Sequence, residues 1–579
     1  MAAEHDLVIR GGRVVDGTGG PARTADVAVV GDRIVEVGHV EGRGRSELDA
    51  DGALVTPGWV DVHAHYDGQA TWDDHLAPSS WQGVTTVVMG NCGVGFAPVH
   101  APDHDRLIEL MEGVEDIPGA ALHEGLSWEW SSFASYLDFL DQRRRDIDLG
   151  AQFPHGAVRL HVMGERGAAA EPATADDIAR MAELARQGVE AGALGFTTSR
   201  TLNHRTSRGE PTPTLLAEAD ELAGIAAALG AAGKGVLQVV SDFKDLDHEF
   251  ATMRRMVAES GRPLSISIAQ SPVVPDTWRE LLDRITQANA DGLPMTGQVA
   301  TRAIGLLLGL QCTLNPFMTA PRYREMADRP LAERVSLMSD PEVRAAILAD
   351  IGDRQRGLIG GRLIHKWHLM YHLADPPDYE PDPATCAQAV ADREGRSPED
   401  VVYDWVLSDN GEGFVYMPSL NYVDGNLDAV REMLLHPHTV PGLADGGAHV
   451  GTISDGSFPT TLLAHFGRQR SRGDLLDVPF IVGSHTADTA RTVGLADRGV
   501  LAPGYKADVN VIDFDNLVVR RPTMAADLPA GGRRLLQRAE GYMHTICSGT
   551  EIFIGGEPTG ALPGRLVRGA QPRPSAAAR

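Results

Sequence analysis

The sequence predicts an α/β fold: a (β/α)₈ TIM-like barrel joined to a small β-sandwich formed by both chain termini. Two observations predict it. From about residue 57 to residue 300, strand-like apolar runs alternate with amphipathic helical runs, which is typical of a parallel sheet with helices outside. Short strands rich in Val and Ile, separated by Gly and Asp turns, occupy both ends of the chain. At 579 residues, the chain is long enough for one large barrel with additions.

The terminal modules come first. Residues 6–56 contain DLVIRGGRVVDGTG, ADVAVVGDRIVEVG and GALVTPG, and strand-and-turn texture returns after residue 500. We therefore expect one β-sandwich domain from residues 1–56 and 480–579.

The barrel is expected within residues 57–479. Its predicted strands cover residues 60–64, 85–89, 158–162, 193–197, 235–240, 263–268, 293–299 and 439–444. Predicted helices cover residues 175–191, 215–232, 275–289 and 427–435. Residues 301–410 interrupt the alternation, so we expect an insertion before the last barrel unit.

Composition excludes some partners. The chain has 52 basic and 79 acidic residues and a net charge of −27, which argues against nucleic acid or an anionic membrane as the main partner. We find no secretory signal and no run of 18 apolar residues. The four cysteines are widely spaced, which favours a reducing compartment. These features predict a cytoplasmic soluble protein, and they leave open a homo-oligomer.

The strongest chemical signal is His63-Ala64-His65 at the end of the first predicted barrel strand. Alternate residues of a strand share a face, so the two imidazoles point the same way. Active sites of barrels lie at this end of the strands. The alternative is a pair of solvent-facing loop histidines, but the strand-end position favours metal ligands.

Cys92 follows the next strand within Gly90-Asn91-Cys92-Gly93. A thiolate is a soft anion that suits zinc, and the strand end would place it on the same rim as the two histidines. The alternative is an inert buried cysteine.

Asp445 follows the eighth predicted strand. A carboxylate there is a candidate metal ligand and a candidate general base for a metal-activated water. A helix N-cap is the alternative. His449, four residues later, is a candidate substrate-binding residue or a simple loop histidine.

The chain has only four lysines, Lys234, Lys244, Lys366 and Lys506, and none lies at a predicted strand end where a carbamylated lysine would bridge two metals. If an anionic bridge exists, Cys92 is the better candidate.

These motifs, in this order, resemble the amidohydrolase superfamily, and within it the branch of D-aminoacylases, or N-acyl-D-amino-acid deacylases. The segments that carry the resemblance are LVIRGGRVVDGTG, TPGWVDVHAHYDGQATWD, GVTTVVMGNCG, MEGVEDIPGAAL, SDGSFPTTLL and DRGVLAPGYKADVNVIDFD. The resemblance implies zinc-dependent hydrolysis of a non-peptide C–N bond, with one or two ions. It matches His63 and His65 to the metal histidines, Cys92 to the metal cysteine and Asp445 to the general base.

The sequence departs from that family at three places. The family's metal histidines at the ends of strands five and six are absent from VLQVVSDF and LSISIAQSPVV, where Asp242 and Gln270 are among the polar residues offered instead. The family's substrate-binding lysine after strand six and arginine after strand eight are also missing. Two alternatives therefore stay open: a non-catalytic protein that binds a small molecule or partner, and a hydrolase of esters or lactones.

Overall fold

The computed structural model describes residues 4–352 and 363–575. Its centre consists of parallel strands arranged in two sheets. In order along the chain they are β6 (Trp59–Asp61), β7 (Val84–Met89), β8 (Asp148–Ala151) with its continuation β9 (Phe153–Pro154), β10 (Gly195–Arg200), β11 (Val236–Ser241), β12 (Leu264–Ile268), β13 (Met295–Ala300) and β17 (Thr439–Gly442).

Parallel pairing follows this order from β6 to β8 and from β9 to β17. A parallel bridge between Ala64 and Gly446 then joins the extensions of β6 and β17. The first and last strand ends therefore lie side by side, which places distant sequence motifs in one site.

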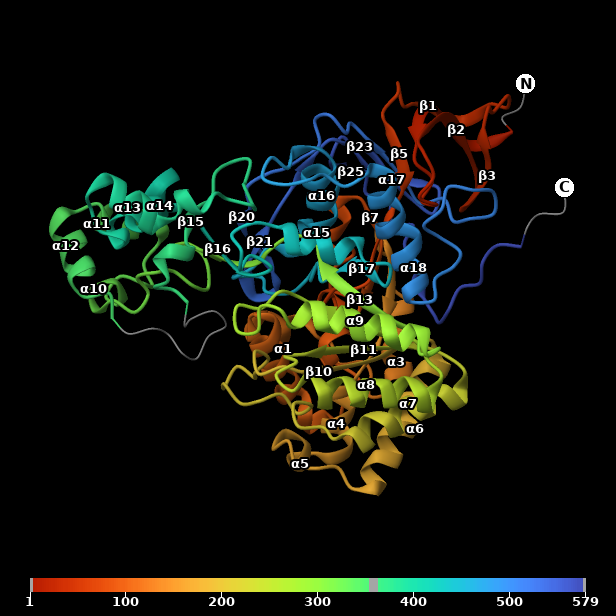
Figure 1. The fold of residues 1–579 in the computed structure, drawn as a ribbon, viewed down its shortest axis with the longest axis horizontal. Coiled ribbons are helices and arrows are strands. Elements are labelled where there is room, and N and C mark those ends of the chain that lie inside the picture. The colour runs from red at the N-terminus through yellow and green to blue at the C-terminus, as the bar shows by residue number, and fades with distance from the viewer. Residues whose placement is uncertain (1–3, 353–362, 576–579) are drawn as a thin grey trace.

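Helices lie outside the strands. They include α1 (His104–Glu115), α3 (Phe133–Asp141), α6 (Ala175–Ala191), α7 (Ala219–Ala232), α8 (Leu246–Ser260), α9 (Thr277–Ala290) and α15 (Asp428–Leu435). In Figure 1, α6, α7 and α8 lie side by side, and their apolar faces contribute Met181, Leu222 and Met253 to the main core. After β17, α17 (Val478–Gly483) and α18 (Thr489–Thr492) follow, and α18 contacts β6 and β17.

The predicted third strand was wrong. Residues 158–162 belong to α4 (His155–Met163), where Val158 and Val162 have helical spacing. The real third strand, β8, reads DLGA and lacks the β-branched run that predicts strands. Gly150 explains part of this composition, because a Cβ added there would lie 2.3 Å from Leu194 Cδ1.

Both chain ends contribute to one β module, as predicted, and these strands form a single sheet. Its N-terminal strands are β1 (His5–Val14), β2 (Arg23–Val30), β3 (Arg33–Gly38), β4 (Gly44–Asp49) and β5 (Leu54–Pro57). Its C-terminal strands are β18 (Val509–Ile512), β23 (Tyr542–Cys547), β24 (Thr550–Ile554) and β25 (Glu557–Pro558). Because β18 lies between β5 and β23, the two chain ends share one hydrogen-bonded sheet. The first half of β1 pairs with β4 and the second half with β5, so the sheet forks there around a core that includes Val27, Val55 and Val509.

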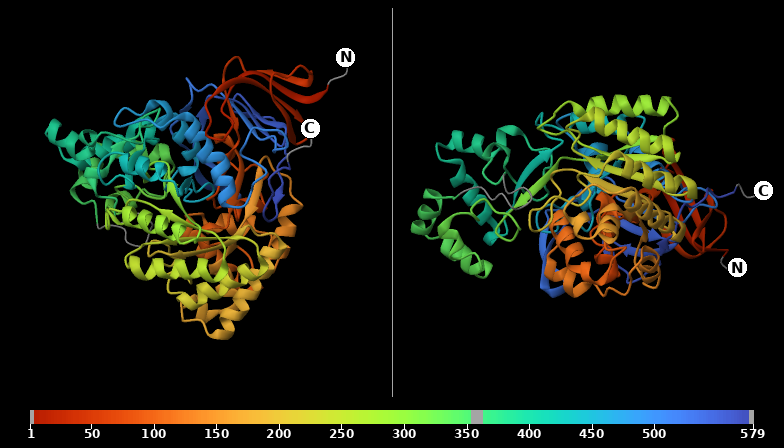
Figure 2. Two further views of the ribbon diagram at one scale, coloured as in Figure 1. Left: turned by 45° about the vertical axis from the view of Figure 1, so that its right-hand side comes forward. Right: turned by 90° about the horizontal axis from the view of Figure 1, so that it is seen from below.

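The predicted insertion contains a separate lobe, which projects from the barrel in Figures 1 and 2. It begins with β14 (Ile304–Leu308), which pairs with β16 (Val415–Leu420), and β16 also pairs with β15 (Tyr371–His372). Its helices are α10 (Pro321–Arg324), α11 (Leu331–Met338), α12 (Pro341–Ala349), α13 (Ala387–Glu394) and α14 (Pro398–Gly411). The lobe has its own apolar cluster, which includes Leu308, Met338, Val402 and Met417. Part of the predicted insertion, residues 353–362, lies outside the described residues.

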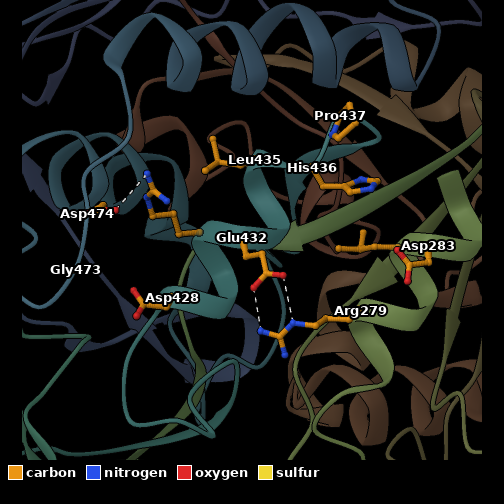
Figure 3. A pocket seen from close by; sticks show the side chains of 11 residues that line it. Arg279, Asp283, Asp428, Glu432, Leu435, His436, Pro437, Gly473 and Asp474 are labelled. Atoms are coloured by element: carbon orange, nitrogen blue, oxygen red, sulfur yellow. Dashed lines mark hydrogen bonds and ion pairs between the residues drawn. The ribbon is translucent and has the colours of Figure 1, made fainter.

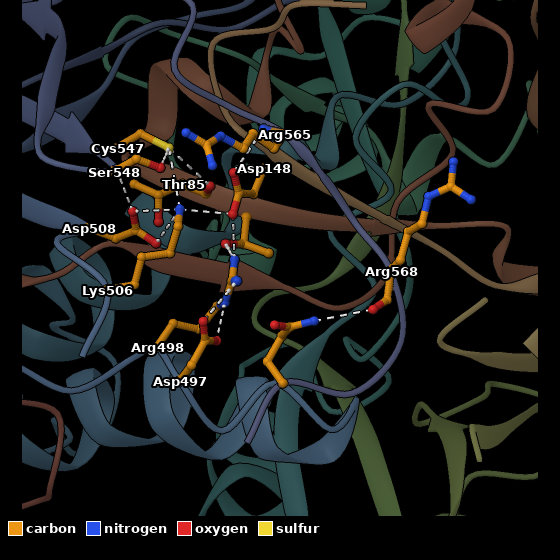
Figure 4. A network of polar contacts seen from close by, with 12 residues as sticks. Thr85, Asp148, Asp497, Arg498, Lys506, Asp508, Cys547, Ser548, Arg565 and Arg568 are labelled. Atoms are coloured by element: carbon orange, nitrogen blue, oxygen red, sulfur yellow. Dashed lines mark hydrogen bonds and ion pairs between the residues drawn. The ribbon is translucent and has the colours of Figure 1, made fainter. Parts of the chain in front are cut away.

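A buried ion cluster joins the barrel to the terminal sheet (Figure 4). Asp148, the first residue of β8, lies 2.7 Å from Arg498 and 2.8 Å from Lys506. Lys506 also contacts Asp508, just before β18, at 3.1 Å. The cluster is at the amino end of a barrel strand, and this end of such barrels serves stability. Lys506 therefore has a structural role.

Candidate metal centre

The carboxyl ends of β6, β7 and β17 bring four predicted residues together. One ligand atom from each of His63, His65 and Cys92 lies within 4.8 Å of the other two. His63 Nε2 is 3.3 Å from Cys92 Sγ. Asp445 Oδ1 is 3.5 Å from Nε2 of both His63 and His65. Among the described residues, the three-residue group His63, His65 and Cys92 is the one whose spacing could hold a metal ion.

Backbone contacts between the strand ends hold the two histidines in place. Ala64 N donates to Val88 O at 3.0 Å and His65 N donates to Gly446 O at 2.8 Å, so the HxH segment continues the parallel pairing beyond β6. Asp445 N donates to His63 O at 3.0 Å. Both imidazoles therefore face the space between the first and last strands.

Cys92, Asp445 and His449 all have left-handed backbone conformations, with φ of 55°, 48° and 49°. This region is disfavoured for residues other than glycine, and such outliers cluster at functional sites. At Cys92 the turn is fixed by Asn91, whose Nδ2 donates to Val88 O at 2.8 Å. This backbone turn places the Cys92 thiol 3.3 Å from His63 Nε2.

The buried environment sets the protonation of these groups. Burial lowers the pKa of His63 to about 4 and raises the pKa of the Cys92 thiol to about 12. Burial would also raise the pKa of Asp445, but its contacts with His65 and His63 outweigh burial and hold that pKa well below its usual range. At neutral pH, His63 is therefore neutral and Asp445 is ionised.

Each imidazole has a partner at Nδ1 that the sequence did not single out. His63 Nδ1 lies 2.8 Å from Gln298 Oε1, and Gln298 Nε2 donates to Ser265 Oγ at 2.9 Å. His65 Nδ1 lies 3.2 Å from Glu115 Oε1. Gln298 lies in β13 and Glu115 ends α1, so their spacing along the sequence gave no signal that they contact the two histidines.

Two further histidines lie close to the group. His449 Nε2 is 3.7 Å from Glu115 Oε2, which places the predicted substrate-binding residue beside the cluster. The other is His204, whose Nδ1 lies 2.8 Å from Ser199 Oγ. Burial, with the nearby His449 and His65, lowers the pKa of His204 to about 3.

The polar residues of strands five and six are used elsewhere. Asp242 accepts from Thr201 Oγ1 and, at 2.9 Å, from Leu202 N, so it anchors the loop after β10. Gln270 Nε2 donates to Asp424 at 2.7 Å and holds the chain where it returns from the insertion. Neither belongs to the three-residue group.

A groove of about 770 Å³ lies elsewhere, on the outer surface between α9 and α15 (Figure 3). Its walls are mostly charged, and Arg279 spans it to Glu432 at 2.9 Å. None of its lining residues belongs to the cluster.

The model of the Amidohydrolase family matches residues 46–356 and 412–553, which is most of the chain. The chain belongs to the amidohydrolase family. This amidohydrolase is 28% identical over 575 residues to the N-acyl-D-glutamate deacylase of Alcaligenes xylosoxydans xylosoxydans, a match covering 98% of this chain and 97% of that one. It is 27% identical over 566 residues to the D-aminoacylase of the same organism, covering 97% of both chains.

Solved structures share the fold. A D-aminoacylase variant in complex with copper chloride superposes with a TM-score of 0.65 at 24% identity, covering 97% of this amidohydrolase and 100% of that chain. The N-acyl-D-glutamate deacylase from Bordetella bronchiseptica, complexed with zinc and a phosphonate inhibitor, gives 0.63 at 24% identity, covering 97% and 99%.

These findings confirm the predicted resemblance, the predicted fold class and the predicted class of enzyme, a hydrolase acting on non-peptide C–N bonds. A non-catalytic binding protein is not favoured. All four cysteines are free thiols. No helix in the described ranges, 4–352 and 363–575, is long and apolar enough to cross a membrane.

Proposed function

We propose that this amidohydrolase is a zinc-dependent hydrolase of the amide bond in a small N-acyl compound, similar to an N-acyl-D-amino-acid deacylase. The observation that carries the proposal is the convergence of His63, His65, Cys92 and Asp445 from three strand ends. The names of the full-length relatives support this substrate class. A small-molecule substrate and a cytoplasmic setting belong to the same proposal.

The residues fit zinc. Ligands of tetrahedral zinc lie about 2.0–2.3 Å from the ion and hence about 3.3–3.7 Å from one another, and the contacts of His63 Nε2 with Cys92 and Asp445 are 3.3 Å and 3.5 Å. Asp445 Oδ1 is buried without a hydrogen-bond partner, as expected of an oxygen that faces a cation. His63, His65 and Cys92 would hold the ion, with Asp445 beside it. When bound, zinc supplies Lewis acidity that makes water more acidic and polarises a carbonyl.

Asp445 is the proposed general base. Its carboxylate is ionised at neutral pH, so it can take a proton from the attacking water and later give that proton to the leaving amine. The amide C–N bond breaks, a C–O bond forms, and the products are a carboxylate and an amine. His449, which lies with Asp445 in the loop after β17, is proposed to contact the substrate.

The first test measures bound zinc in the purified protein and in His63→Ala and Cys92→Ala. We expect about one zinc per chain or more in the wild type and loss in both variants. Unchanged metal content in both variants would remove this site. The matched control is Cys386→Ala, because Cys386 lies in the insertion, where its Sγ accepts from Ala389 N at 3.4 Å.

The second test measures turnover of Asp445→Asn at full zinc loading. We expect a loss of several orders of magnitude with metal retained, since general base catalysis and transition-state charge both depend on this carboxylate. Near wild-type turnover would exclude Asp445 as the base.

A substrate panel separates the remaining possibilities. It compares N-acyl-D-amino acids, N-acyl-L-amino acids, cyclic imides, esters and lactones. Preference for N-acyl-D-amino acids supports the proposal. Turnover confined to esters or lactones would replace it by that alternative.

A further inference from the structure

We propose that Glu115 is a positioning residue of the metal centre: its carboxylate holds the His65 ring with Nε2 towards the cluster and connects that ring to His449. This inference rests on the proposed zinc site. It concerns the segment MEGVED, which the four proposed site residues leave without a role.

The end of α1 is built to aim Glu115 inwards. The helix stops at Glu115, and Asp116 adopts a φ of 52° that turns the chain. The Asp116 carboxylate accepts from Gly451 N at 3.2 Å and from Thr452 Oγ1, and His449 N donates to the Glu115 carbonyl oxygen. These contacts fasten α1 to the loop after β17.

Burial of the Glu115 carboxylate at this position is energetically unfavourable. It is 1% exposed, neither oxygen has a well-aligned hydrogen bond, and it stands at the carboxyl end of a helix, where the dipole disfavours an anion. Its ion-pair partners among the described residues are His65 at 3.2 Å and His449 at 3.7 Å. A role confined to stability would favour a neutral side chain here.

The arrangement makes sense if His65 binds a cation. Metal-bound histidines commonly direct the second ring nitrogen at a carboxylate, which fixes the ring and raises its basicity. His65 presents Nε2 to Asp445 and Nδ1 to Glu115, as that role requires. His63 has the parallel arrangement with the neutral Gln298. The charged partner therefore distinguishes His65 from His63.

The experiment measures zinc affinity by competition with a chromophoric chelator, together with the thermal midpoint of the metal-free protein. For Glu115→Gln we expect zinc affinity to fall about 10–100-fold, while the metal-free midpoint stays equal or rises. Glu109→Gln is the matched control on the same helix, because Glu109 pairs with the exposed Arg208. We expect it to leave zinc affinity unchanged.

A double-mutant cycle tests whether Glu115 acts through its neighbour. In a His65→Ala background, Glu115→Gln should have little further effect on zinc affinity, because the ring it positions is gone. Glu115→Asp keeps the charge and should restore part of the affinity. If zinc affinity of Glu115→Gln matches the wild type, or if the two substitutions are additive, the inference is wrong. If the wild type itself binds no zinc, the proposed function fails first.

Discussion

Each imidazole of the centre is held from behind by a residue on another element. Gln298 holds His63 and is itself held by Ser265, so the Nδ1 proton of His63 has a fixed acceptor. This leaves Nε2 facing Cys92 and Asp445. If the two histidines bind zinc as proposed, the residues behind them decide how well the rings are oriented.

Replacing Gln298 tests this orientation. We expect Gln298→Leu to weaken zinc binding by about 10–100-fold, since the ring loses its acceptor. Gln238→Leu is the control: Gln238 is equally buried in β11 but contacts Ser267, at 3.4 Å, and no ligand. Equal zinc affinities in the two variants, measured by chelator competition, would show that Gln298 has no positioning role.

The protonation of the ligands predicts how zinc binding depends on pH. The Cys92 thiol, with a pKa of about 12, must lose its proton to bind zinc, and so must His65, because burial is outweighed by Glu115 and Asp445, which raise its pKa well above the usual value. His63, with a pKa of about 4, is already neutral at pH 7. Zinc affinity should therefore rise with pH, by about tenfold per pH unit for each proton released. Calorimetry in buffers of different ionisation enthalpy counts those protons. A pH-independent affinity between about pH 6 and pH 8 would contradict a thiolate ligand.

At this scale, the sequence predicted the proposed metal ligands but not the residues behind them. His63, His65, Cys92 and Asp445 follow strand ends, and strand ends of one barrel meet at one rim. Glu115 ends a helix and Gln298 lies inside a strand, and only the three-dimensional structure shows that they approach His65 and His63.

Among the elements, β8 differs most from its sequence-based expectation. Its sequence contains Asp and Gly because it serves the terminal sheet as well as the barrel. Asp148 contacts Arg498 and Lys506, and Leu149 pairs with the returning strand β26 (Leu566–Val567). A strand fixed by long-range ion pairs carries no local β signal, so the apolar residues 158–162, which are helical, give the stronger strand signal.

The buried cluster predicts a stability loss in Asp148→Asn. Removing one partner leaves the Arg498 and Lys506 charges buried with less compensation, which costs about 3–5 kcal/mol. Urea unfolding should show a lower midpoint, while Asp105→Asn, an exposed change on α1, should not. An unchanged midpoint in Asp148→Asn would mean that the cluster contributes no net stability.

The same cluster predicts acid sensitivity. Burial opposes ionisation of Asp148, but Lys506 and Arg498 outweigh it and lower its pKa from 3.8 to about 2. A lowered carboxyl pKa stabilises the fold above the unfolded value and loses that contribution as pH falls through the folded value. The wild type should therefore lose stability between about pH 4 and pH 2, more steeply than Asp148→Asn. Parallel slopes of midpoint against pH would contradict this assignment.

Across the whole molecule, the C-terminal part of the chain makes two connections, the first to the terminal sheet and the second to the barrel. β18 enters the terminal sheet between β5 and β23, and then β26 returns to pair with β8. The alternation of strands and helices predicted the barrel, and the texture of both ends predicted their shared sheet. The return of residues 566–567 was not predictable, because two residues carry no periodicity. The exact domain boundaries, including the one near residue 480, stay a prediction.

Truncation tests the second connection. Leu566 and Val567 are buried, and Val567 packs in a cluster with Val60, Val62 and Val88 beneath the strand that leads to His63. Burial of an aliphatic side chain contributes about 1.5–3 kcal/mol, so removing residues 565–579 should cost about 3–6 kcal/mol. Arg565 N also donates to Asp148 Oδ1 at 3.0 Å, so the ion cluster loses a contact as well.

Urea unfolding of the metal-free protein is the measurement. Leu566→Ala should show part of the loss, and the exposed change Ala570→Ser should show none. If the truncated chain unfolds at the wild-type midpoint, the returning strand does not stabilise the barrel.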